Sequence, residues 1–297
     1  MNIALTLVVN PEFNNSLDKI ETKAIRALNI SRHDHMELSE GKACDILFDY
    51  ASVTEAKAKL EEELNLIEGL DWAVQPSDNR RKKLILADMD STMIPVECID
   101  ELADFVGLKD KVSAITEAAM RGELNFEGAL TERVALLKGL TTEQLAACYT
   151  DRISLMPGAK TLIQTMKANG AYSALVSGGF TYFTSKVATT VGFDMNHANV
   201  LEIDDGALTG HVVPPICGAE TKLEALQQLA SEKGLAKDDI LAVGDGANDI
   251  PMIEAAGLGV AYHAKPKTQA AASAAVRYGD LTSLLYFQGY KDSDFIS

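Results

Sequence analysis

Short apolar runs that alternate with helical segments are the feature that most constrains this fold. In the second part of the chain such runs recur at 84–89, 172–178, 239–246, 257–262 and 274–278. Segments with helical spacing lie between them, for example 159–170 and 221–234. A near-continuous apolar strand is buried on both faces, and alternation with helices is typical of a parallel sheet covered on both sides. The sequence therefore predicts an α/β, Rossmann-like core.

Polar clusters follow three of these runs, at the strand ends where ligands of parallel sheets bind. In the first cluster, DMDST, Asp88 and Asp90 come directly after the apolar residues 84–87. Two adjacent carboxylates repel each other, so either one holds a proton or a cation binds to both. With Mg²⁺ bound, one carboxylate can attack phosphorus as a nucleophile while the other protonates the leaving oxygen. The alternative is a solvated pair of acids at the end of a strand.

Three further stretches favour a phosphate site at the same edge. Ser177 and Gly178 end the second core strand, where a hydroxyl and backbone N–H groups can approach phosphoryl oxygens. Lys222 stands near the start of a helix and can neutralise phosphate there. Asp245 and Asp249 follow the apolar run 240–243 and offer the hard oxygen ligands that suit Mg²⁺.

Each of these stretches also has a structural interpretation: a strand-to-helix turn, a surface lysine and a glycine-rich acidic turn. Asn248, inside the segment GDGAND, is placed to reach a substrate. The agreement of all the clusters in order and position favours the functional interpretation.

The chain before and between the core strands predicts additional units. Residues 1–76 read as strand, helix, two strands, helix and strand, a βαββαβ order that predicts a ferredoxin-like domain. Residues 77–82 are polar and basic, as a linker would be, and 83–297 form the α/β domain. Strand patterns vanish at about 95–156, which predicts a helical insertion after the first core strand. An Asp-Gly pair within 202–213 predicts a hairpin.

Composition narrows the class of protein. The formal net charge of −16 argues against a nucleic-acid binder, which needs a basic face, but not against a small anionic substrate in a locally cationic pocket. No run approaches the roughly 18 apolar residues of a membrane span, so we expect no membrane partner. The four cysteines lie far apart, which fits a reduced cytoplasmic protein better than a disulfide framework.

Taken together, DMDST, SGG, Lys222 and GDGANDIPM resemble, in order, the four motifs of the haloacid dehalogenase superfamily. The resemblance covers roughly residues 83–280, and the helical insertion resembles the first cap type of that superfamily. Within it, ECIDELA, VSGGF and the cap stretch from Ala119 to Leu140 resemble the phosphoserine phosphatases. The four motifs are specific for the superfamily, whereas the cap stretch carries the resemblance in substrate.

The resemblance implies a role for each matching residue. Asp88 would be the nucleophile that becomes an aspartyl-phosphate, and Asp90 the general acid and then the base that activates water. Mg²⁺ would be held by the Asp88 carboxylate, the Asp90 carbonyl and Asp245, with support from Asp249. The residues that would hold phosphate or substrate are Ser177, Gly178, Lys222, Asn248, Glu97, Arg133, Met120 and Phe126.

In the cap, the resemblance assigns Glu97 to the substrate ammonium and Arg133 to its carboxylate. Arginine suits a carboxylate because its planar fork binds two oxygens. Without the resemblance, the two charges read as solvated helix positions, and Met120 and Phe126 as cap core. The implied reaction is hydrolysis of phosphoserine as the last step of serine biosynthesis.

Two other functions stay open. The first is an enzyme of the same scaffold that acts on another small phosphate ester or transfers phosphate to another acceptor. The second is a non-catalytic amino-acid sensor. Residues 1–76 resemble the small amino-acid-binding domains called ACT, and ligand sensing, formation of a homodimer and a plain role in assembly are alternatives for them.

Overall fold

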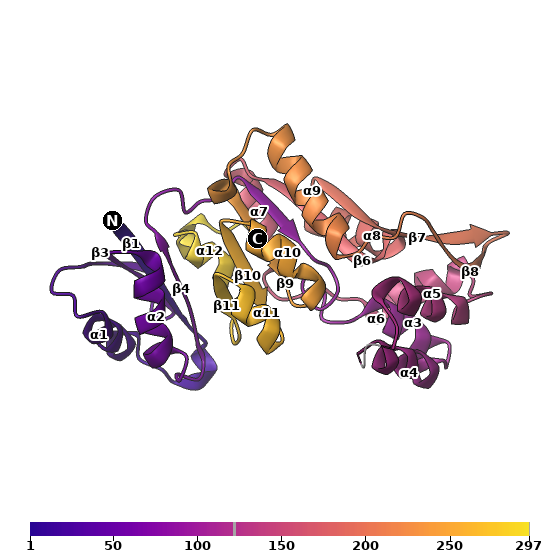
Figure 1. Ribbon diagram of the computed structural model, residues 1–297, viewed down its shortest axis with the longest axis horizontal. Helices are drawn as coiled ribbons and strands as arrows, with labels where there is room; N and C mark the ends of the chain where they lie inside the picture. Colours follow the sequence, from indigo (N-terminus) through magenta and orange to yellow (C-terminus); the bar gives the residue numbers. More distant parts are fainter. Residues whose placement is uncertain (121–122, 297) are drawn as a thin grey trace.

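The computed structural model describes residues 1–120 and 123–296, without the side chains of residues 119 and 120. Eleven strands form one continuous sheet in this part of the chain, in the order β2-β3-β1-β4-β11-β10-β9-β5-β6-β7-β8. Figure 1 shows three regions along the longest axis: the N-terminal strands and helices at one end, the α/β core in the middle and a helical cap at the other end.

The N-terminal residues form the predicted βαββαβ order. Its elements are β1 (Asn2–Val9), α1 (Leu17–Leu28), β2 (Asp34–Ser39), β3 (Ala43–Asp49), α2 (Val53–Leu64) and β4 (Leu70–Pro76). β1 pairs antiparallel with both β3 and β4, and β2 is the edge strand. The apolar stripe of α1, which includes Ile20, Ala24 and Leu28, is buried on one face of the sheet because residues three and four apart share one side of a helix.

The α/β core follows the predicted alternation of strands and helices. Its strands are β5 (Leu84–Ala87), β6 (Tyr172–Phe180), β7 (Met195–Asp204), β8 (Ala207–Val213), β9 (Ile240–Gly244), β10 (Leu258–Tyr262) and β11 (Ala274–Val276). The helices are α7 (Ala159–Ala168), α8 (Thr181–Val191), α9 (Ala219–Glu232), α10 (Ile250–Ala255), α11 (Pro266–Ala271) and α12 (Ser283–Phe287). The α/β class and the parallel core predicted from the sequence are confirmed.

β5 lies at the point where the strand order reverses. It pairs in parallel with β6 on one side and with β9 on the other, although long stretches of the chain separate these strands. All four residues of β5 are fully buried, as its unbroken apolar sequence requires. Crevices in open α/β sheets form at such a reversal, outside the carboxyl ends of the strands. The chain therefore turns out of the sheet at Asp88, at the place where a ligand site is expected.

The predicted insertion between the first two core strands is helical. Its helices are α3 (Cys98–Phe105), α4 (Lys109–Met120), α5 (Phe126–Leu136) and α6 (Thr142–Arg152). Three backbone hydrogen bonds fasten the turn between α5 and α6 to the β7–β8 hairpin: Gly139 N–H to Leu208 O, Leu208 N–H to Leu140 O and Thr142 N–H to Gly206 O, all within 2.8–2.9 Å. The hairpin therefore supports the cap, as its position beside α5 in Figure 1 shows.

The hairpin prediction was incomplete at its first strand. β7 begins at Met195, pairs in parallel with β6 through Met195–His197, and only later pairs with β8. Because this stretch is polar, its sequence did not indicate that it belongs to the core sheet.

The predicted linker, 77–82, forms no helix or strand, and Arg80 donates two hydrogen bonds to Asp45, of 2.6 and 2.9 Å. The boundaries of the domains stay a prediction.

Candidate active site

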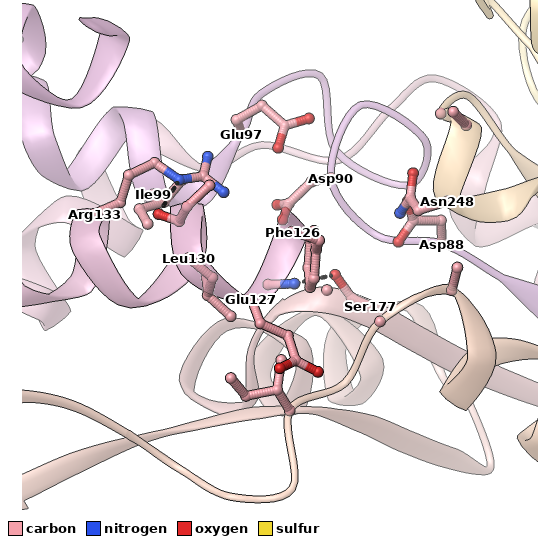
Figure 2. A pocket seen from close by; sticks show the side chains of 18 of the residues that line it. Asp88, Asp90, Glu97, Ile99, Phe126, Glu127, Leu130, Arg133, Ser177 and Asn248 are labelled. Atoms are coloured by element: carbon pink, nitrogen blue, oxygen red, sulfur yellow. Dashed lines mark hydrogen bonds between the residues drawn. The ribbon is translucent and has the colours of Figure 1, made fainter. Parts of the chain in front are cut away.

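The predicted site residues gather around one cavity of about 880 Å³ between the strand ends and the cap. Core residues on its wall are Asp88, Asp90, Ser177, Gly178, Asp245 and Asn248, and the cap contributes Glu97, Phe126 and Arg133. Lys222 and Asp249 lie directly behind Asp88 and are fully buried. The side chain of Met120, also predicted to line the pocket, lies outside the described residues. Figure 2 shows Asp88 and Asn248 on one side and Arg133 on the other.

A buried lysine lies between two carboxylates at the base of the cavity. The Lys222 ammonium lies 2.8 Å from Asp88 Oδ1 and 2.5 Å from Asp249 Oδ1. Burial and the charge of Asp249 raise the pKa of Asp88, and Lys222 opposes the shift. The two carboxylates raise the pKa of Lys222 despite its burial, so the lysine stays charged. The lysine was predicted to be near phosphate, and the structure adds this contact with the two acids.

Asp88, Asp245 and Asp249 form a cluster of hard oxygen ligands. One carboxylate oxygen from each lies within 4.8 Å of the others. Burial, followed by the charge of Asp249, raises the pKa of Asp245 to about 6. Three acids facing one ammonium leave negative charge uncompensated, and an oxygen-only ligand set suits Mg²⁺ rather than a softer metal. The donor set therefore fits the hard divalent cation that the sequence predicted.

Asp90 faces the cap. Its Oδ1 accepts a hydrogen bond of 3.2 Å from the backbone N–H of Cys98, the first residue of α3. Burial, and next the charge of Glu97, raises the pKa of Asp90 to about 7. A carboxyl with such a pKa can hold a proton at neutral pH and exchange it, which is the requirement for an acid that later acts as a base.

Two residues outside the predicted set of site residues shape the wall around Ser177. A Cβ atom on Gly179 would lie 2.5 Å from Asp90 Oδ2, so any larger residue at this position would displace the carboxyl. The Gly179 N–H donates to Ser177 Oγ at 2.9 Å. Buried Asn199, on β7, donates to Gly178 O at 2.8 Å and accepts from Cys217 N–H at 2.7 Å. The second glycine of SGG could have indicated the close approach of Gly179 to Asp90. Nothing in the sequence indicated the role of Asn199.

The cap closes the cavity with one aromatic ring and two charges. The Phe126 ring reaches Gly178, since a Cβ there would lie 3.1 Å from Phe126 Cζ. Arg133 is anchored by its Nε, which donates to Ala129 O at 3.2 Å, and burial lowers its pKa. Glu97 accepts a 2.8 Å hydrogen bond from Ser91 Oγ. The guanidinium of Arg133 and the carboxylate of Glu97 thus line the same wall near Asp90, as Figure 2 shows.

Comparison with known proteins identifies the family of this arrangement. The sequence model of the haloacid dehalogenase-like hydrolase family matches residues 85–254, the stretch that carries all the strand-end clusters. The chain belongs to the haloacid dehalogenase-like hydrolase family. The resemblance predicted from the four motifs is thereby confirmed.

Relatives of this hydrolase include proteins named for one substrate. A phosphoserine phosphatase of Polaromonas sp. is 47% identical over 208 residues, covering 68% of this chain and 88% of that protein. A phosphoserine phosphatase of Archaeoglobus fulgidus is 44% identical over 232 residues, covering 77% and 67%. These matches place the chain among relatives of phosphoserine phosphatases.

Solved structures show the same fold. A haloacid dehalogenase family hydrolase of Salmonella enterica serovar Typhi superposes with a TM-score of 0.85 at 32% identity, over 97% of this chain and 98% of that one. A substrate-bound phosphoserine phosphatase complex matches 69% of this chain and 98% of its own, with a TM-score of 0.65 at 41% identity. Among the described residues, no helix has both the length and the apolar character needed to cross a membrane.

Proposed function

We propose that this hydrolase is a Mg²⁺-dependent phosphoserine phosphatase that converts O-phospho-L-serine to L-serine and phosphate. The observation that carries the proposal is the distribution of charge in one cavity. Lys222 and the acidic cluster stand at the phosphate end, and Arg133 and Glu97 stand at the cap end. Phosphoserine carries a phosphate, a carboxylate and an ammonium, and this wall offers a partner of opposite charge for each. The relatives named for phosphoserine support the same substrate.

In the first step, the Asp88 carboxylate attacks phosphorus and forms an aspartyl-phosphate. Lys222, at 2.8 Å, favours the ionised form that attacks. The bond from phosphorus to the serine oxygen breaks, and the Asp90 carboxyl gives its proton to that oxygen, so serine leaves as an alcohol. Bound Mg²⁺ would be held by Asp88, Asp245 and Asp249 and would offset the negative charge that phosphate brings to these acids.

In the second step, Asp90, now ionised, takes a proton from a water molecule that attacks phosphorus. The phosphorus–oxygen bond to Asp88 breaks, which releases phosphate and restores the first carboxylate. Ser177 accepts from Gly179 N–H, so its own hydroxyl proton is available for a phosphoryl oxygen in both steps. We propose that L-serine made in this way is the end product of serine biosynthesis.

The first experiment is to measure phosphate release from L-phosphoserine and from a panel of other phosphate esters, with Mg²⁺ and after its removal by EDTA. We expect rapid release that depends on Mg²⁺ and favours L-phosphoserine. Release from other esters alone would keep the aspartate chemistry but contradict the substrate. Absence of release from every ester, together with tight binding of serine, would favour the amino-acid sensor.

The nucleophile can be tested by chemical trapping. Acid quenching of a reaction with phosphate-labelled substrate should leave label on the wild-type protein in a form that hydroxylamine removes, as an acyl phosphate requires. Asp88→Asn should carry no label and show no turnover. Near-normal turnover by this variant would refute the assignment of Asp88.

Arg133→Ala tests the recognition of the substrate carboxylate. Hydrogen bonds to charged groups contribute about 1.5–3 kcal/mol, so we expect kcat/KM for L-phosphoserine to fall roughly 10- to 150-fold. Hydrolysis of an aryl phosphate without a carboxylate should be unchanged. Arg152→Ala is the matched control, since Arg152 lies in the cap on α6 and pairs with Glu101 and Asp104 outside the cavity. An equal loss for both substrates would assign Arg133 a structural role.

A further inference from the structure

A second group of metal-binding side chains lies in the N-terminal unit, at the opposite end of the molecule from the cap (Figure 1). Glu21 on α1, His35 on β2 and Cys44 on β3 each point one ligand atom to a common place, with all three atoms within 4.8 Å of one another. The function of the enzyme makes no use of this group.

The pairing of the two strands explains why these side chains meet. His35 is opposite Ile46 and Glu37 is opposite Cys44 in the antiparallel register, so His35 and Cys44 are diagonal neighbours on one face. Cys44 and Ile46 belong to the core beneath α1 and α2. The face is therefore the one that α1 covers, and Glu21 reaches over its edge from the helix.

The carboxylate of Glu21 already has two histidine partners. Its Oε2 lies 2.9 Å from His35 Nδ1, and its Oε1 lies 3.5 Å from His33 Nε2. The Glu21 side chain is 13% exposed, whereas His33 and His35 are 29% and 45% exposed. The group is thus closed on the side of the protein core and open toward solvent, which leaves a path for an ion to enter.

We propose that Glu21, His35 and Cys44 bind Zn²⁺. His33, whose Nε2 lies 3.5 Å from Glu21 Oε1, would have to move toward the three to become a fourth ligand. Thiolate, imidazole and carboxylate are the ligands that Zn²⁺ takes, at bond lengths of about 2.0–2.3 Å in tetrahedral sites. Ligand atoms in such a site lie closer together than 4.8 Å, so the three side chains need only small adjustments of their rotamers. Mg²⁺, which takes oxygen ligands, is excluded by the sulfur and nitrogen atoms.

The electrostatic surroundings favour a cation. Burial, followed by the charges of Glu21, Asp45, Asp18 and Glu37, raises the pKa of Cys44 to about 12. The same acids that disfavour an isolated thiolate stabilise a divalent ion at this place. On binding, the Cys44 thiol gives its proton to solvent and the sulfur bonds to the metal. The ion would join edge strand β2 to α1 and so stabilise the N-terminal unit without entering the reaction.

Cobalt absorption on the full-length protein tests the proposal, because a thiolate bound to Co²⁺ gives a near-ultraviolet charge-transfer band. We expect this band on adding Co²⁺ in the presence of excess Mg²⁺, and its loss on adding one equivalent of Zn²⁺. Cys44→Ala should remove the band. Cobalt bound by the active-site carboxylates alone gives no such band. Cys217, which lies beside Asn199 at the wall of the active site, could supply a thiolate there. Cys217→Ala should therefore retain the band if it arises at Cys44.

His35→Gln provides a second test that leaves the buried core intact, since His35 is nearly half exposed. We expect its affinity for Zn²⁺, measured by competition with a chromophoric chelator, to fall at least about tenfold. Removing a residue that only hydrogen-bonds to a metal ligand already causes a loss of this size. Exposed His211, on β8, supplies the matched control His211→Gln, which should bind Zn²⁺ as the wild type does. A missing cobalt band, or one that survives both Cys44→Ala and His35→Gln, would overturn the proposal.

Discussion

Replacing Lys222 by methionine removes the only charge that the described structure places between Asp88 and Asp249. The ammonium lies within 2.8 Å of both carboxylates, and the side chains of Lys222, Asp88 and Asp249 are 0%, 7% and 0% exposed. Breaking a buried ion pair by removing one partner costs about 3–5 kcal/mol, because the other charge stays buried without compensation. Methionine nearly matches lysine in volume, so packing contributes little to the loss.

We therefore expect Lys222→Met, in EDTA at pH 8, to lower the free energy of unfolding by about 3–5 kcal/mol. The pKa of Asp88 is raised in the folded protein and rises further without the lysine. A carboxyl whose folded pKa is raised stabilises the fold at low pH, and this contribution is lost as the pH rises through that pKa. The destabilisation should accordingly be smaller at pH 5 than at pH 8.

Urea unfolding at both pH values, with and without Mg²⁺, measures these effects. Mg²⁺ at about 100 times its Kd should stabilise the variant by roughly 2.7 kcal/mol, because the ion binds the folded state and not the unfolded chain. We expect no turnover by Lys222→Met even with Mg²⁺, since the ion does not replace an ammonium at its position. Lys267→Met, at an exposed lysine on α11, is the matched control. A Lys222→Met protein within about 1 kcal/mol of the wild type at pH 8 in EDTA would refute this electrostatic reasoning.

Two further predictions concern the carboxyl of Asp90. Gly179→Ala puts a methyl group 2.5 Å from Asp90 Oδ2, and we expect displacement of that carboxyl to lower kcat about 100-fold. Steady-state kinetics measure the loss, and thermal unfolding shows whether the variant is folded. An unchanged kcat in a folded variant would contradict the contact. Glu97→Gln removes a charge that raises the pKa of Asp90. We expect the basic limb of kcat/KM, measured with an alkyl phosphate that lacks an ammonium group, to lie at lower pH in this variant than in the wild type. A limb at the same pH in both proteins would remove Glu97 as a cause of the raised pKa.

The shared position of the strand-end residues was predictable because a parallel sheet aligns the carboxyl ends of its strands. Asp88 follows β5, Asp245 follows β9 and Ser177 lies in the last part of β6, and the register of these strands brings all three to one edge. Each strand was recognisable from its own apolar run. No contact between distant segments had to be known in advance.

The contacts from other layers were not predictable in this way. Asn199 reaches Gly178 and Cys217 only because β7 joins the sheet beside β6, and its polar sequence gave no sign of that. Arg133 and Glu97 were assigned through a family resemblance. The sequence around a charged residue in the cap does not reveal whether its side chain faces solvent or a cavity. The spacing of apolar residues predicts which face of a helix or strand is buried, but not which residue packs against that face.

The division of the site between core and cap has a consequence for function. The groups that we propose to make and break bonds lie at the strand ends, where the sheet fixes the backbone. Asp88, for example, directly follows β5, which is held between β6 and β9. The groups that would distinguish one phosphate ester from another lie on the cap, as Arg133 does on α5. Substitutions in the cap should therefore exchange one substrate for another while the aspartate chemistry continues, whereas substitutions at the strand ends should stop hydrolysis of every ester alike.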